Sequence, residues 1–264
     1  MNDPFAHVAG LPGVPEAVAA AREAVDRLLG HRILRRQSAE VSAESALRGA
    51  RASAELEGAP ASLEDVRAGL VEDPLIQGAL RVSASLGSLA PTWRVAPRQA
   101  LARLHVLAVS GSDSGFDSGS LGRPRASLEA TDPLSLGSPP SPSQVAERLS
   151  SLSDLLTTPT EAPALVVAAV AQGELLALRP FGSADGLVAR AAARLTLIDR
   201  GLDPKSLAAP EVGHVELGSA YAEAIRAYVS GTPSGVGQWV SHCAEATALG
   251  ARDALAVCEA FTRR

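Results

Sequence analysis

The stretch that most constrains the fold is residues 179–190, which read RPFGSADGLVAR and follow a long apolar run. Pro180 fixes the backbone, and Phe181 can anchor the turn in apolar surroundings. Gly182 and Gly186 let the chain pass close to a ligand. The spacing therefore predicts a tight loop that feeds directly into an alanine-rich helix.

This loop has the features of an anion-binding site. Asp185 is positioned to act as the N-cap of the following helix, which carries Arg190. A helix N-terminus presents free N–H groups and a partial positive charge to an anion such as phosphate. We therefore take Gly182, Asp185, Gly186 and Arg190 as candidate nucleotide- or anion-binding residues.

The composition of the 264 residues favours a mainly helical chain. Hydrophobic residues make up 46% and aromatic residues only 3%, so alanine and leucine must build the core. One domain over residues 1–264 is the simplest organisation. Apolar spacing and cap signals predict helices over 14–29, 33–56, 62–71, 74–88, 97–109, 143–156, 161–178, 186–199, 217–229 and 236–261.

Charge and hydropathy exclude several classes of function. The formal charge is −5, and acidic and basic residues are mixed, so no basic stripe is available for nucleic acid. The most apolar run, residues 162–171, is far shorter than the ~20 residues that cross a bilayer. The N-terminus does not resemble a signal peptide. We expect a cytoplasmic protein that binds neither nucleic acid nor membrane.

The cysteines and histidines do not indicate a metal site. Cys243 and Cys258 fall on one predicted helix, roughly 22 Å apart at ~1.5 Å per residue, so they are expected to be buried thiols rather than a disulfide. His105 lies on an apolar helix face and is expected to be a core residue. His214 and His242 could serve as a base, although nothing in the sequence places either near Arg179.

Between the helices, composition changes. Residues 110–122 are of low complexity and are expected to form a loop. Residues 123–141 contain several serines and the Pro139-Pro140 pair and cannot sustain a helix, so a short hairpin or extended flap is expected there.

Three features in this order resemble the Fic family, whose active members transfer nucleotide monophosphates, usually AMP, to a protein hydroxyl. Ser53-Ala-Glu-Leu-Glu57-Gly58 is similar to the family's inhibitory-helix signature. Leu121-Gly-Arg-Pro-Arg125 resembles the segment that leads into its flap. Residues 179–190 stand in the place of its signature, His-Pro-Phe-x-(Asp/Glu)-Gly-Asn-Gly-Arg-x-x-Arg.

The resemblance covers about residues 35–260 and implies a mainly α Fic-type helical domain with a small β-hairpin flap. It also implies a division of the chain. An N-terminal extension (1–34) and an inhibitory-helix-like segment (35–60) precede a core over 97–200 with the flap at about 121–141, and C-terminal helices (201–264) follow. In the family the flap aligns the target polypeptide by strand addition, so a protein partner is expected at residues 121–141.

The signature departs from the family pattern at the positions of the catalytic base, the metal ligand and the phosphate-binding residues. Arg179 stands at the catalytic histidine and cannot act as a general base. Ser183 replaces the metal-binding acid, so Mg²⁺ is not expected. Asp185 replaces the asparagine of the anion-binding turn, Ala184 a glycine, and Leu187 the first arginine.

One pairing of the family is retained. The inhibitory glutamate contacts the second signature arginine in autoinhibited members, and the matching residues here are Glu57, with Ser53 opening its motif, and Arg190. We expect a carboxylate–guanidinium contact between them, bidentate in its ideal form, that acts as a strut between two helices.

Two functions remain open at this point. The first is a degenerate Fic-family protein that lacks ordinary AMP transfer (AMPylation) and acts by binding a nucleotide, another anion or a protein. The second is a transferase of altered chemistry that uses a nucleotide-linked or phosphorylated donor, with Asp185 as acid or base. Arg179 either lines a retained pocket or lies on the surface, and the second interpretation is slightly favoured.

Overall fold

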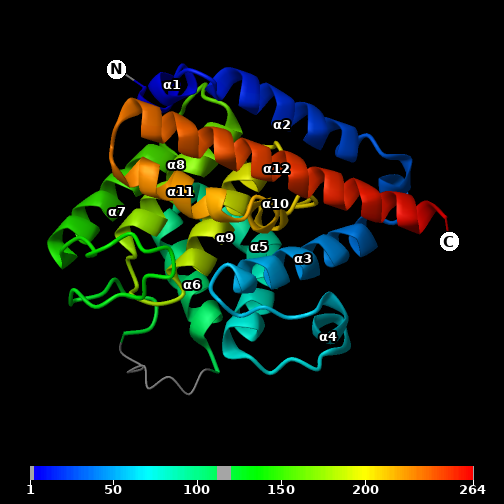
Figure 1. Ribbon diagram of the computed structural model, residues 1–264, viewed down its shortest axis with the longest axis horizontal. Coiled ribbons are helices and arrows are strands. Elements are labelled where there is room, and N and C mark those ends of the chain that lie inside the picture. The colour runs from blue at the N-terminus through cyan, green and yellow to red at the C-terminus, as the bar shows by residue number, and fades with distance from the viewer. Residues whose placement is uncertain (1–2, 112–119, 264) are drawn as a thin grey trace.

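Helices form all the regular structure of the computed structural model, which describes residues 3–111 and 120–263 (Figure 1). They are α1 (Pro4–Ala9), α2 (Val14–Leu29), the 3₁₀ helix η1 (Arg32–Arg35), α3 (Ser38–Glu55), α4 (Leu63–Ala68), α5 (Pro74–Val95), α6 (Pro97–Val109), α7 (Pro142–Thr157), α8 (Ala164–Leu178), α9 (Asp185–Asp199), α10 (Pro210–Glu216), α11 (Ser219–Val229) and α12 (Pro233–Thr262).

The candidate loop joins the two most buried helices. α8 is apolar on nearly every side, and α9 is buried from Asp185 to Leu197. A helix that is apolar all round must be enclosed by other elements. α3, α5 and α6 pack against α9, while α7, α11 and α12 pack against α8. The loop between α8 and α9 is therefore held by the core on both sides.

The long C-terminal helix forms an outer layer. α12 runs beside α2 along one side of the molecule, and α10 and α11 lie between α12 and the centre (Figure 1). Trp239 of α12 is fully buried and donates its indole N–H to the Ala169 carbonyl of α8, 2.7 Å away. This hydrogen bond ties the outer layer to the central helix.

Several predicted helix boundaries are corrected. The helix expected over 33–56 is divided into η1 and α3, with Arg36 and Gln37 between them. α5 continues beyond its expected end to Val95 and contains Pro91. Ser141, rather than the expected Ser143, caps α7 through a reciprocal capping box with Gln144. The short helices α1 and α10 were not predicted, because each has too few residues to show a period.

The predicted β-hairpin is wrong for the described part of the flap, since residues 120–141 contain no strand. The flap instead runs as irregular chain along the candidate loop. Arg125 N–H donates to the Pro180 carbonyl at 2.8 Å, and Thr131 N–H to the Gly182 carbonyl at 2.9 Å. Prolines remove ladder donors from this segment, which explains the absence of a paired strand. Of the predicted loop over 110–122, residues 112–119 lie outside the described part.

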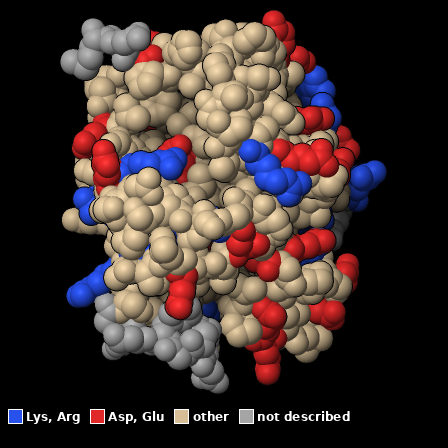
Figure 2. Space-filling model, turned by 60° about the vertical axis from the view of Figure 1, so that its left-hand side comes forward, with Lys and Arg blue, Asp and Glu red and all other residues tan. Residues whose placement is uncertain are grey.

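Charged side chains of both signs are scattered over the face in Figure 2, with broad uncharged areas between them. Along the described chain, every helix is too short or too polar to cross a bilayer.

Candidate functional site

The loop between α8 and α9 reverses direction through three left-handed residues. Arg179 has φ 45°, Gly182 has φ 79° and Ala184 has φ 52°. A left-handed conformation costs a residue with a Cβ roughly 1–2 kcal/mol, so Arg179 and Ala184 are held in place by their surroundings. Phe181 supplies one such contact by stacking on His105 with ring centroids 4.4 Å apart.

Asp185 is the first residue of α9 and is almost fully buried. It is not the expected N-cap, because Ala184 takes that position and makes no side-chain cap. One carboxylate oxygen, Oδ1, accepts from Phe181 N–H at 2.9 Å, while Oδ2 has no hydrogen-bond partner. Burial raises the pKa of Asp185 to about 7, and the neighbouring Phe181 and Gly182 N–H groups offset this only in part.

Arg179 is buried rather than on the surface, so the favoured interpretation of this residue is wrong. Its side chain is 6% exposed. Nη2 donates to the Gly137 carbonyl at 2.8 Å, and Nη1 lies 3.4 Å from Asp132 Oδ2. Nε and Nη1 make no hydrogen bond in the described structure. The guanidinium thus fixes the flap over the loop.

Arg190 is fully buried, and each of its three side-chain nitrogens donates a hydrogen bond. Nη2 lies 2.8 Å from Glu57 Oε1 and also donates to the Ser53 carbonyl, while Nε donates to Ser53 Oγ at 2.8 Å. Nη1 donates to the Tyr221 hydroxyl at 3.2 Å. The expected Glu57–Arg190 contact is present, although a single carboxylate oxygen makes it, so it is not bidentate. Burial opposes the charge of Arg190, but Tyr221 and Glu57 raise its pKa above the ordinary value.

The Glu57 carboxylate also lies over the N-terminus of α9. A Cβ added at Gly186 would be 1.9 Å from Glu57 Oε1, which shows how closely the carboxylate approaches the backbone there. A negative charge at a helix N-terminus is stabilised by the helix dipole. Glu57 therefore occupies the position that the sequence indicates for an anion.

Little space remains between these groups. Glu57, Asp132, Arg179, Asp185 and Gly186 are among the residues that line a hollow of about 10 Å³. This is close to the smallest volume that holds one water molecule. In this conformation the site is closed to any ligand of nucleotide size.

Solved structures share this arrangement of helices. A Fic family protein from Desulfovibrio desulfuricans G20 aligns with a TM-score of 0.72 and 18% identity, over 91% of this chain and 74% of its own. Fic-1 from C. elegans and a variant of it each align with a TM-score of 0.66 and 16% identity, over 94% of this chain and 73% of their own. The chain has a Fic-like fold. No protein-family model and no curated protein matches the sequence.

Within the Fic-like fold, the residues present do not fit a magnesium ion. Ser183 offers a hydroxyl instead of a carboxylate, and Asp185 is left with a single free carboxylate oxygen, Oδ2, because Oδ1 is bonded to Phe181 N–H. The described residues contain no group of three or more His, Cys, Asp or Glu side chains that could hold a metal. Mg²⁺ requires an octahedral set of oxygen ligands with at least one carboxylate in most protein sites.

Two residues at the loop were not identified from the sequence as part of the site. His105 accepts from Gly122 N–H at Nδ1 (3.1 Å), so its neutral form donates from Nε2 to Ser183 Oγ at 3.3 Å. Burial lowers the pKa of His105 to about 4, which keeps it neutral at pH 7. It is the core histidine that was expected, but it also holds the loop.

Arg125 is the second such residue. It is buried, and its guanidinium donates to the carbonyls of Ser127, Pro140, Leu178 and Arg179. It therefore joins both arms of the flap to the end of α8. Only its place in the Leu121–Arg125 segment could have indicated this role, because its partners are far apart in the sequence.

His214 and His242 lie beside Tyr221, whose hydroxyl accepts from Arg190. His214 Nδ1 is 3.0 Å from His242 Nε2, and its Nε2 is 3.2 Å from the Gln172 amide. Both rings pack against Tyr221. Burial lowers the pKa of His242 to about 4 and that of His214 well below its ordinary value. Both histidines pack against Trp239 as well, and with their other partners they form a buried ring cluster between α10, α11 and α12, which gives them a structural role.

Proposed function

We propose that this chain is a degenerate Fic-family protein that has lost nucleotidyl transfer and acts by binding an anion or a protein. The observation that carries the proposal is the buried guanidinium of Arg179, bonded to Gly137 and beside Asp132, at the position of the family's catalytic base. A guanidinium stays protonated and cannot accept a proton from an incoming hydroxyl.

Two further observations support the loss of transfer. Ser183 engages His105 and supplies no carboxylate for a metal. Leu187, at the position of the first signature arginine, is buried in the apolar core instead of facing the anion site. The binding function would be exerted at Arg190 when Glu57 moves away, or at the flap.

The transfer test uses the whole protein with labelled nucleoside triphosphates and Mg²⁺ or Mn²⁺, followed by intact mass of the protein and of a treated lysate. No nucleotidyl adduct is expected. A covalent adduct that depends on this chain would overturn the proposal.

Arg179→His alone is not expected to restore AMP transfer. The variant recovers an imidazole, but Ser183 and Leu187 still lack the metal and phosphate contacts that the family signature provides. The same mass assay measures this. Transfer by the single variant would show that these losses matter less than argued.

The binding test compares Glu57→Ala with Glu55→Ala, two residues apart on the same segment. Removing Glu57 uncovers Arg190 and the N-terminus of α9, whereas Glu55 pairs with Arg51 away from the site. Thermal shift across nucleotides, sugar nucleotides and phosphorylated metabolites should show stabilisation in Glu57→Ala that exceeds the control. Equal responses would contradict anion binding at Arg190.

The second candidate function is a transferase of altered chemistry with Asp185 as acid or base. It is favoured by the unpartnered Oδ2 of Asp185 and by its pKa of about 7. A general acid or base works best when its pKa lies near the operating pH. Incubation with phosphorylated and nucleotide-linked donors should give a product that Asp185→Asn does not form, and the absence of any such product would contradict it.

A further inference from the structure

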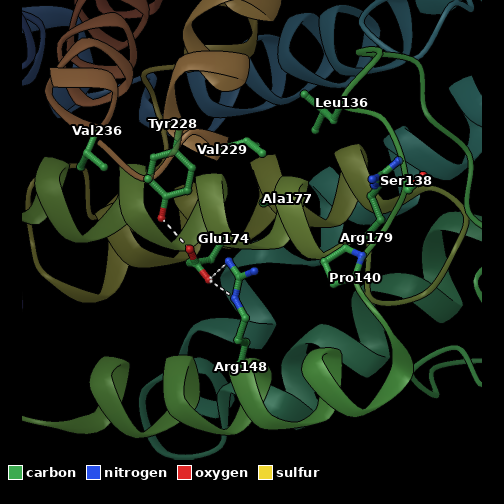
Figure 3. A pocket seen from close by; sticks show the side chains of 11 residues that line it. Leu136, Ser138, Pro140, Arg148, Glu174, Ala177, Arg179, Tyr228, Val229 and Val236 are labelled. Carbon is green, nitrogen blue, oxygen red and sulfur yellow. Dashed lines mark hydrogen bonds and ion pairs between the residues drawn. The ribbon is translucent and has the colours of Figure 1, made fainter. Parts of the chain in front are cut away.

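A second cavity shares Leu136 and Arg179 with the small hollow beside Glu57, and Arg190 does not line it. It has a volume of about 220 Å³ and is bounded by α7, α8, the α11–α12 connection and the flap (Figure 3). Its apolar walls are formed by Leu136, Pro140, Ala177, Val229 and Val236, and its polar groups come mainly from Arg148, Glu174, Tyr228 and Arg179.

The polar end of this cavity is built from three side chains on different helices. Glu174 Oε2 accepts from Arg148 at Nη2 (2.7 Å) and Nε (3.2 Å), and Oε1 accepts from the Tyr228 hydroxyl at 2.8 Å. These contacts fix the plane of the Arg148 guanidinium. They also engage both carboxylate oxygens of Glu174, so the carboxylate has little capacity left to hold a cation.

Arg148 retains donors that face away from Glu174. A guanidinium carries five N–H groups, and Glu174 accepts only one from Nη2 and the one from Nε. Nη1 has no hydrogen-bond partner among the described residues, and Figure 3 shows one nitrogen of Arg148 turned away from Glu174 without a dashed line. The edge formed by Nη1 and Nη2 matches the two oxygens of a carboxylate in parallel.

We propose that this cavity binds a small molecule with one carboxylate and a short apolar chain. The carboxylate is held by the outer edge of Arg148, and the chain lies along Ala177, Val229 and Val236. The size of the cavity is below the ~300 Å³ typical of sites for drug-sized ligands, so the chain is only a few carbons long. This site is separate from the anion position at Arg190 and does not depend on the function proposed above.

Butyrate is the probe that tests this site, titrated into the whole protein by calorimetry at constant ionic strength. We expect saturable binding that weakens about tenfold or more in Arg148→Met, which removes a charge-assisted hydrogen-bond pair. Val229→Trp, at a half-exposed residue of the wall, should also abolish binding by filling the cavity without changing its charge.

Arg94→Met is the matched control, because Arg94 forms an exposed ion pair with Asp199 and does not line the cavity. It should bind butyrate as the unmodified protein does. Butylamine and inorganic phosphate, titrated in parallel, should bind at least about tenfold more weakly than butyrate. Absence of butyrate binding, equal binding of either other probe, or unchanged butyrate binding in Arg148→Met or Val229→Trp would overturn the proposal.

Discussion

Arg190 is the side chain on which the closed state of the site depends most. It is fully buried, and Glu57 supplies the only carboxylate bonded to it in the described structure. A buried charge that loses its partner costs far more free energy than an exposed one, because water cannot replace the contact. The Glu57–Arg190 ion pair should therefore contribute to stability even without a ligand.

Glu57→Gln should lower the free energy of unfolding by about 1–3 kcal/mol, since Arg190 keeps Ser53 and Tyr221 but loses its counter-charge. Glu55→Gln is the control, because Glu55 and Arg51 form a pair about 30% exposed that should contribute at most ~1 kcal/mol. Urea denaturation of both variants measures the difference. Equal effects would mean that the ion pair is not a strut.

Asp185 should make stability depend on pH. Its folded pKa of about 7 lies above the ordinary value of 3.8, so the folded protein binds this proton more tightly than the unfolded chain does. The protonated carboxyl therefore adds on the order of 4 kcal/mol to the free energy of unfolding below pH 3.8, and this contribution is lost as pH rises towards 7.

Asp185→Asn keeps an oxygen for the Phe181 N–H but does not titrate. Its unfolding free energy, measured by urea denaturation from pH 4 to 8, should exceed that of the unmodified protein increasingly as pH rises. A difference that does not change with pH would show that Asp185 stays ionised throughout.

At the scale of elements, the flap is held mainly by side chains, and no strand among the described residues pairs with it. Arg125 donates to four carbonyls on both arms of the flap and on the end of α8, while Arg179 donates to Gly137. Within the described part of the chain, two backbone hydrogen bonds, from Arg125 and Thr131, join the flap to the loop. The conformation of the flap should therefore depend on the two arginines more than on its own backbone.

Arg125→Met should loosen the flap without unfolding the helices. We expect hydrogen exchange at the Thr131 amide to accelerate about tenfold or more. Without Arg125, its four carbonyl partners would be bonded to water instead, so the flap would open from the loop more often. Arg123→Met is the control, since Arg123 is exposed and lies two residues away. Equal protection of the Thr131 amide in both variants would show that Arg125 does not hold the flap.

These elements also show how much could be predicted from the sequence. The loop and the helix after it were predicted because proline, glycine and apolar spacing determine the backbone conformation of the few residues around them. The Glu57–Arg190 contact was predicted only through a resemblance of ordered motifs. The burial of Arg179 and the bonds of Arg125 to Leu178 and Arg179 could not be predicted, since they depend on carbonyls that folding brings from 42 to 54 positions away in the chain.

At the scale of the whole molecule, small residues let the helices approach closely in a core with few aromatic side chains. A Cβ added at Gly78 of α5 would lie 2.0 Å from the Ala108 carbonyl oxygen of α6, and one at Gly213 of α10 would lie 2.1 Å from the Ala246 oxygen of α12. Alanine and glycine are thus packing residues here and not only helix formers. The composition of the sequence predicted helices but not which glycines lie at their crossings.

Two glycines of α5 test this account within one helix. Gly78→Ala should destabilise the protein by about 1–3 kcal/mol or more, because the methyl group meets backbone that cannot move independently. Gly87 is exposed with nothing within 4 Å of an added Cβ, so Gly87→Ala should stabilise by about 0.5–1 kcal/mol through helix propensity alone. Thermal and urea unfolding of the two variants measure both signs. If both substitutions stabilise the protein, α5 and α6 are not in the close contact that positions α9 and the loop.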